Sequence, residues 1–176
     1  MNTARSPRRY RMLSVTLASF SGLLALRTCE APPQDAEPVI EVAAPAPADP
    51  LLLEAFTTAN VYRAGNGLPS LIWDERAAAA AAQQSTDQAT SHALSHTGAD
   101  GSTAKSRLRT AGYPTKWWAE NAAAGYQTGT DVIWGWMNSE SHARYILSPS
   151  AVHIGIGIAH AADGTSYWTM DLASGG

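Results

Sequence analysis

Two short segments in the last part of the chain constrain its fold most strongly. Residues 152–158 alternate isoleucine and valine with glycine and histidine, and residues 166–172 are rich in aromatic and apolar side chains. Asp163-Gly164 lies between them, and an Asp-Gly pair favours the tight turn of a β-hairpin. The pattern therefore predicts an antiparallel hairpin whose apolar face must be covered by another layer.

Helical patterns precede this hairpin. Pro50 stands in the first-turn position of a helix that runs to about Arg63, and Asp74 caps a long helix over 75–91 that contains six consecutive alanines. Shorter elements are expected as helices at 102–110, 131–137 and 140–147 and as one strand at 118–125. Helices, one early strand and a final hairpin indicate an α+β fold, with a small antiparallel sheet flanked by helices.

The first 50 residues have a different character. Residues 1–29 carry arginines but no acid around an apolar run of about 15 residues, which is typical of a secretory signal and short for a membrane anchor. Residues 30–49 are rich in proline and alanine, as in an extended spacer. We therefore expect a signal peptide or lipoprotein-type leader at 1–29, a linker at 30–49 and one folded domain at 50–176. This organisation predicts an extracytoplasmic protein, periplasmic or secreted.

Cys29 is the only cysteine in the chain. A leucine three residues before it matches a lipoprotein cleavage site, so lipidation at Cys29 and removal with the leader are both open. In either case no intramolecular disulfide can form, and the domain must be held by its core alone. The domain has slightly more acidic than basic residues and no basic stripe with interleaved aromatics, which argues against nucleic-acid binding.

Three separated motifs carry the functional information: Ser95-His96, Glu120-Asn121 and His142. They stand in order with Asn60-x-x-Arg63, Gly67-Leu68-Pro69-x-Leu71-x-Trp73-Asp74, Asp100-Gly101, Gly112-Tyr113, Trp136-Met137-x-Ser139 and His153-Ile154-Gly155-Ile156-Gly157. Over residues 50–173 this frame resembles the CAP superfamily (the SCP or cysteine-rich secretory protein domain) in its short bacterial form. The resemblance implies an α-β-α sandwich with a shallow cavity lined by two histidines and two glutamates.

The resemblance assigns three cavity positions and leaves the fourth open. His96 and His142 match the two histidines, and Glu120 matches the glutamate of the Glu-Asn pair. At the position of the second glutamate this chain has Ser139, and Glu140 follows one residue later, a rotation of about 100° on a helix. The candidate binding residues are therefore His96, Glu120 and His142, with Ser139 and Glu140 beside them.

Several functions fit these residues. We favour an exported binding protein over an enzyme, with an unknown small ligand, lipid or cell-envelope component as partner and membrane contact only through a retained or lipidated leader. The alternative is a hydrolase that uses zinc or another divalent metal, with His96 and His142 as ligands and Glu120 as third ligand or general base. A serine nucleophile beside a histidine is less favoured, since no Gly-x-Ser-x-Gly elbow is present. An inert structural domain is the third possibility. His153 is expected to pack rather than to react.

Overall fold

The computed structural model describes residues 46–175, so the predicted leader and most of the predicted linker lie outside it. The described part contains α1 (Pro50–Gly65), β1 (Ile72–Trp73), α2 (Glu75–Ser91), α3 (Ala104–Thr110), β2 (Trp117–Ala124), α4 (Gly129–Met137), α5 (Glu140–Ile146), β3 (His153–His160) and β4 (Ser166–Ser174). Within these residues no helix combines the length and the apolar composition that a membrane span requires.

The four strands form one sheet in the order β1-β3-β4-β2. The predicted hairpin is present, since β3 pairs antiparallel with β4 from His153 opposite Ala173 to His160 opposite Ser166. Strand β2 pairs antiparallel with the other side of β4. The sequence analysis missed β1, which pairs parallel with β3 through only two residues. The sheet is therefore small and largely antiparallel, with one short parallel edge.

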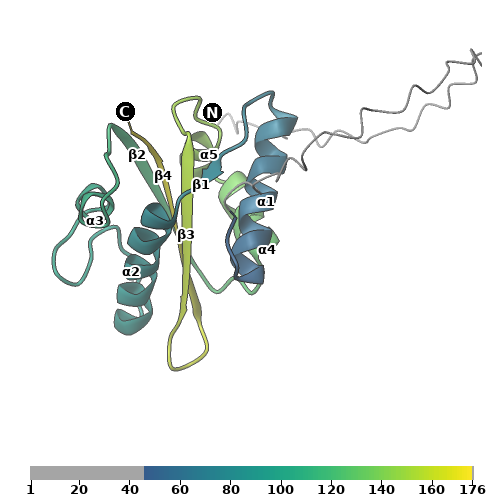
Figure 1. The fold of residues 1–176 in the computed structure, drawn as a ribbon. Coiled ribbons are helices and arrows are strands. Elements are labelled where there is room, and N and C mark those ends of the chain that lie inside the picture. The colour runs from purple at the N-terminus through teal and green to yellow at the C-terminus, as the bar shows by residue number, and fades with distance from the viewer. Residues whose placement is uncertain (1–45, 176) are drawn as a thin grey trace, which may run out of the picture. The chain divides into compact units, whose positions relative to one another are not determined.

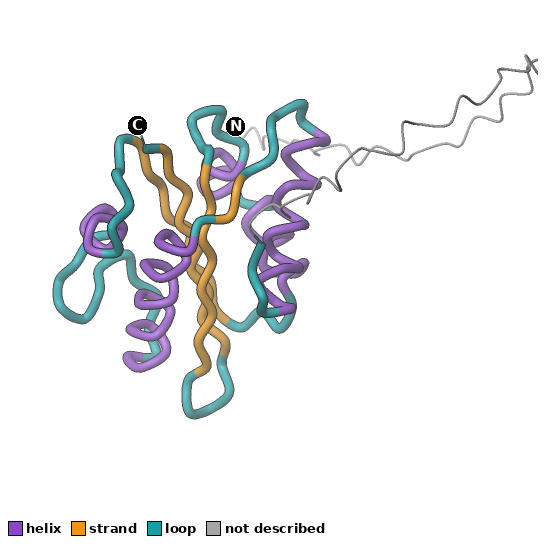
Figure 2. The backbone as a smooth tube through the Cα atoms, viewed as in Figure 1, coloured by secondary structure: helices purple, strands orange, loops and turns teal. Residues whose placement is uncertain are grey.

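Helices cover both faces of this sheet. Helices α2 and α3 lie on one face, and α1, α4 and α5 lie on the other (Figures 1 and 2). The α+β class and the α-β-α sandwich expected from the sequence are confirmed. The main core fills the space between the sheet and α1, α4 and α5, and includes Ile133, Ile146, Ile154 and Trp168.

The alanine run and the glycines of β3 explain how closely α2 approaches the sheet. A Cβ atom on Gly155 would collide with the backbone at Ala77 and Ala78, and one on Gly157 would collide with the backbone at Ala81 and Ala82. Small residues on both elements therefore allow helix and strand backbones to touch. This contact presses α2 against the hairpin, and the loop that follows α2 carries His96.

Side-chain caps mark the starts of helices α1 to α4. Asp74 accepts hydrogen bonds from the first backbone N–H groups of α2, as the sequence predicts, and Asp49 does the same for α1. Helix α3 begins two residues later than expected, because Thr103 and Ser106 form a reciprocal capping box. This cap determines where α3 presents Arg107.

Candidate functional site

A cavity of about 500 Å³ opens beside β2. The loop after α2 and the start of α3 form one wall, helix α5 forms the other, and β2 lies between them. The lining residues are His96, Thr97, Thr103, Ala104, Trp118, Ala119, Glu120, Ser141, His142, Arg144 and Tyr145. The structure therefore brings the two predicted histidines and Glu120 to one cavity from three separate parts of the chain.

A buried ion pair holds the first histidine. His96 Nδ1 lies 2.7 Å from Glu120 Oε1, and Arg107 donates from Nη2 to Glu120 Oε2. The side chains of Glu120 and Arg107 are only 2% and 1% exposed, whereas that of His96 is 63% exposed. The hydrogen bond to Glu120 raises the pKa of His96 above its ordinary value. An exposed imidazole is thus oriented, and its protonated form favoured, by a pair that solvent does not reach.

A second carboxyl group lies behind this pair. Asp171 stands opposite Glu120 on β4, and its side chain is completely buried. Burial raises the pKa of Asp171 well above the usual range, and the charge of Glu120 raises it further. Neither oxygen of Asp171 has a hydrogen-bond partner among the described residues, and the same is true of Arg107 Nε. Burial therefore favours the protonated form of Asp171, which lies next to the charged Glu120–Arg107 pair.

The second histidine has a different environment. His142 Nδ1 lies 2.8 Å from Ser139 Oγ, and its carbonyl accepts a 3.4 Å hydrogen bond from Asn121 Nδ2. Burial lowers the pKa of His142, and the charge of His96 lowers it further. The two imidazoles of the cavity thus have pKa values shifted in opposite directions. The Ser139–His142 contact lacks a carboxylate that orients the ring, so it is not a catalytic triad.

The donor set fits a metal only in part. Each histidine is held through Nδ1, and Nε2 of neither ring has a partner among the described residues, an arrangement common in metal-binding histidines. Both oxygens of Glu120 are already engaged, so Glu120 serves to orient His96 rather than to act as a third ligand. No group of three or more His, Cys, Asp or Glu side chains within residues 46–175 is placed to hold a metal ion. The residues present offer two nitrogen ligands, and water would have to complete the coordination.

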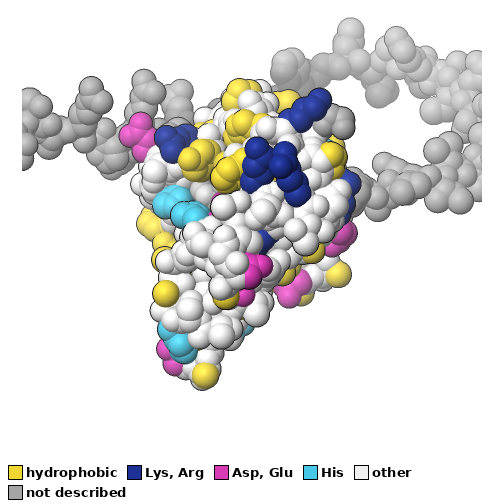
Figure 3. Space-filling view, turned by 90° about the vertical axis from the view of Figure 1, so that its left-hand side faces the viewer, with side chains coloured by type: hydrophobic (Ala, Val, Ile, Leu, Met, Phe, Trp, Pro, Cys, Tyr) yellow, Lys and Arg dark blue, Asp and Glu magenta, His cyan; other side chains and the backbone are white. Residues whose placement is uncertain are grey.

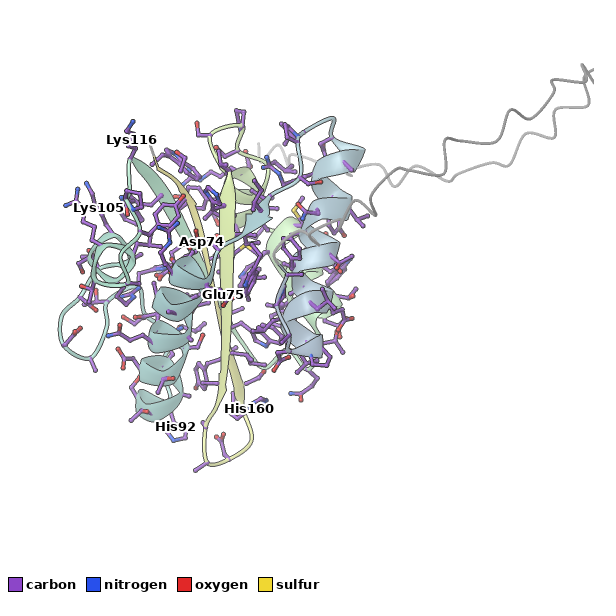
Figure 4. The ribbon with its side chains drawn as sticks, in the orientation of Figure 1. Asp74, Glu75, His92, Lys105, Lys116 and His160 are labelled. Carbon is purple, nitrogen blue, oxygen red and sulfur yellow. The ribbon has the colours of Figure 1, made fainter. Side chains whose placement is uncertain are left out.

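The remaining candidates are not among the residues that line the cavity. Ser139 contacts it through its hydrogen bonds with His142 and Ser141, and Glu140 is exposed at the start of α5. His153 packs against Tyr113, whose hydroxyl lies 2.7 Å from its Nδ1. His92 and His160 line a separate, smaller depression at the far end of the β3–β4 hairpin (Figure 4).

Sequence reasoning missed two groups that set the electrostatics of the site. Arg107 lies in an ordinary short helix and had no local signal. Asp171 did have one, because it is the only acid in the strand-like run 166–172. Arg144 and Tyr145 add a cation and an aromatic ring to the α5 wall. On the face formed by α2 and α3, basic side chains gather with hydrophobic ones toward one end, whereas acidic side chains are scattered (Figure 3).

Comparisons with known proteins agree with this architecture. Residues 56–172 match the CAP, or cysteine-rich secretory protein, family. In Bacillus subtilis, the uncharacterized membrane protein YlbC is 32% identical over 99 residues, which are 56% of this chain and 29% of YlbC. The uncharacterized protein YkwD is 31% identical over 113 residues, which are 64% of this chain and 43% of YkwD. The chain therefore spans less than half the length of either relative.

Solved structures show the same fold. An extracellular protein containing an SCP domain from Bacillus anthracis superposes with a TM-score of 0.62 at 26% identity, covering 74% of this chain and 45% of that one. An outer surface protein of Borrelia burgdorferi gives a TM-score of 0.63 at 18% identity, over 69% of this chain and 90% of that one. The chain belongs to the CAP family.

Proposed function

We propose that this CAP domain works outside the cytoplasm as a binding module, and that its ligand is a small molecule or short chain end held in the cavity between His96 and His142. The location rests on the leader-like residues 1–29 and on the names of similar proteins, which include an extracellular and an outer surface protein. We favour binding over catalysis because the cavity lining contains no pair of a nucleophilic side chain and a general base that a third group orients.

The observation that carries the proposal is the support given to His96. A buried Glu120–Arg107 pair is costly to desolvate, and here it holds a largely exposed imidazole at the cavity mouth. Trp118 on β2 and Tyr145 on α5 add aromatic surface to the same cavity. Oriented polar groups beside aromatic rings are what a small-ligand site requires.

Native mass spectrometry of the exported full chain tests this function. We expect a co-purified small molecule that is lost in His96→Ala and in His142→Ala. His160→Ala is the matched control, because His160 is exposed like His96 but lines the separate depression. Equal ligand occupancy in His96→Ala and His160→Ala would count against the cavity as the binding site.

A metal-dependent activity is the second candidate, favoured by the two imidazoles held through Nδ1. If the histidines bind zinc, both must be neutral, so the affinity should fall as the pH drops, first through the raised pKa of His96. Calorimetric titration should show loss of binding in His142→Ala, about tenfold weakening in Ser139→Ala through loss of ring orientation, and no change in Glu140→Gln. Zinc binding that survives His142→Ala would place the metal elsewhere.

A further inference from the structure

Strand β2 is an edge of the sheet, and part of its open side faces the cavity. Gly125 N donates to Ser166 O of β4, immediately after the last residue of β2. Because successive residues of an antiparallel strand point their N–H and C=O groups to opposite sides, Ala123, Asn121 and Ala119 also face β4. Trp118, Glu120 and Ala122 therefore point their main-chain groups away from the sheet.

An independent contact agrees with this direction. The Trp136 indole N–H donates to the carbonyl of Ala122 at 3.2 Å, from the side opposite β4. The N–H and C=O groups of Trp118 and Glu120 have no such partner among residues 46–175. Both residues line the cavity, so its floor is a short row of unpaired main-chain donors and acceptors.

The two cavity walls lie on opposite faces of the sheet. The side chain of Glu120 reaches His96 and Arg107 on the α3 side. The side chain of the next residue, Asn121, reaches the carbonyl of His142 on the α5 side. A strand laid along the floor would therefore direct alternate side chains towards His96 and towards His142.

Charge narrows the class of ligand. Glu120 is the only acid in the lining, and Arg107 already pairs with it. The remaining charged side chain of the lining is the cationic Arg144. The cavity thus favours an anionic group at the end of whatever lies on the floor.

We propose that the cavity binds the end of an extended peptide, which adds a short strand to the β2 edge at Trp118 and Glu120 and places its free α-carboxylate near His96 and Arg144. Main-chain pairing supplies affinity with little dependence on sequence, as in other cases of strand addition. The walls of α3 and α5 limit the added strand to a few residues. This inference deepens the proposed binding function and rests on it.

Amide NMR on the full chain, labelled with ¹⁵N, tests the main-chain pairing directly. The probe is a pool of acetylated tripeptides with a free carboxylate and mixed residues at the first two positions, added to about 1 mM. We expect shifts of the Trp118 and Glu120 amide protons towards the hydrogen-bonded range. The amides of Ala119 and Asn121 are internal controls, since they already face β4. No shift at Trp118 and Glu120 would overturn the peptide assignment.

Two matched pools separate main-chain pairing from other contacts. Methylation of the middle amide nitrogen removes one main-chain donor and should abolish the shifts. Amidation of the carboxyl end removes the charge and should weaken binding. Methylated peptides that bind as well as the unmodified ones would overturn strand addition, and formation of a dimer in sedimentation would assign the edge to a second copy instead.

A pair of variants gives the same test from the protein side. Trp118→Ala and Trp118→Pro both remove the indole, but only the proline variant also removes the main-chain N–H that points away from β4. An edge strand tolerates proline at such a position, so the fold should be kept. We expect about fivefold weaker peptide binding in Trp118→Pro than in Trp118→Ala. Equal affinities would overturn the proposal. A co-purified non-peptide ligand that depends on His96 would then leave the proposed function standing without the peptide.

Discussion

The domain contains two arginines that are equally buried and do different work. Arg63 and Arg107 each have 1% of their surface exposed. Arg63 has no carboxylate partner among the described residues. It donates to the carbonyl oxygens of Pro69, Ile146, Ser148 and Ala151, at 2.7 to 3.3 Å. Arg107 instead pairs with the buried Glu120 and with the carbonyl of Ser102.

The hydrogen-bond partners of each arginine decide whether its charge can influence the cavity. Carbonyl dipoles are part of the backbone, so Arg63 ties α1 to the segment after α5 and has no titratable neighbour to influence. Glu120 is a charge that also touches His96, so Arg107 is coupled to a group at the cavity mouth. A buried arginine therefore acts either as a structural clamp, which holds backbone segments together, or as an electrostatic support, which stabilises a charge at the site. The partner of the arginine decides between these roles, and the degree of burial does not.

The largest effect is expected at the clamp. Arg63→Met should lower the free energy of unfolding by about 4 kcal/mol, because it leaves several buried carbonyls without donors. No second substitution can restore the balance, since the acceptors are main-chain groups. Urea denaturation measures the loss, and the titration of His96 should stay unchanged in the folded fraction. A loss below about 1 kcal/mol would show that water replaces the guanidinium.

At Arg107 the loss in the free energy of unfolding should be slightly smaller than at Arg63, and a second substitution should partly restore it. Arg107→Met strands the buried charge of Glu120 and should cost about 3 kcal/mol. The double variant Arg107→Met with Glu120→Leu removes both charges and should recover at least about half of that loss. The same urea experiment applies. Failure of the second substitution to recover stability would make Arg107 a clamp of the same kind as Arg63.

Much of the fold followed from local patterns. Isoleucines alternating with glycines predicted β3, and the alanine run predicted α2, because each pattern matches the period of its element. Strand β1 was missed because two residues carry no period. It forms through hydrogen bonds from Ile72 N to the carbonyl of Val152, just before β3, and from Asp74 N to the carbonyl of Ile154 in β3.

The site was predictable where motifs have local frames. His96, Glu120 and His142 matched family positions and lie at one cavity. Their support was not predictable, because the bond from Arg107 to Glu120 is set by how α3 packs on β2. Asp171 did give a usable signal, because a lone acid inside an apolar strand must either pair with a cation or be protonated when the strand is buried. Glu140 is exposed and is not among the lining residues, which agrees with its rotation of about 100° on the helix relative to Ser139.

The third effect is a pH dependence of stability at Asp171, whose pKa is raised by burial next to the Glu120–Arg107 pair. Between the ordinary pKa of an aspartate and this raised value, the folded state holds a proton that the unfolded state has released. Stability should therefore fall as the pH rises through that window. Asp171→Asn mimics the neutral acid and should remove this loss, so the variant gains more over the parent at pH 8 than at pH 5.

Asp163 provides the contrasting control. Its backbone hydrogen bond from Thr165 lowers the pKa of this exposed carboxyl, so its contribution is present at neutral pH and is lost as the pH falls. Asp163→Asn should thus change stability with the opposite dependence on pH. Thermal unfolding at several pH values distinguishes the two. An Asp171→Asn variant that loses stability equally at every pH would show that the acid is charged in the fold.

The smallest effect is a change of titration at the cavity, and it tests the coupling itself. His96 has a raised pKa, so it stabilises the fold below about pH 6.5, and that contribution is lost as the pH rises through its folded value. His142 has a lowered pKa, so its contribution is present above about pH 6.5 and is lost as the pH falls through its folded value. Imidazole NMR should therefore show His96 titrating at higher pH than His142.

Glu120→Gln should lower the pKa of His96, because it removes the carboxylate next to the Nδ1 proton. The pKa of His142 should then rise slightly, because a smaller fraction of His96 carries the charge that lowers it. Ser139→Ala is the control, since it changes the partner of His142 and leaves the Glu120 contact intact. If His96 titrates unchanged in Glu120→Gln, the buried pair does not communicate with the cavity. Arg107 would then differ from Arg63 only in the chemistry of its partner, and the proposed electrostatic support of the site would have to be abandoned.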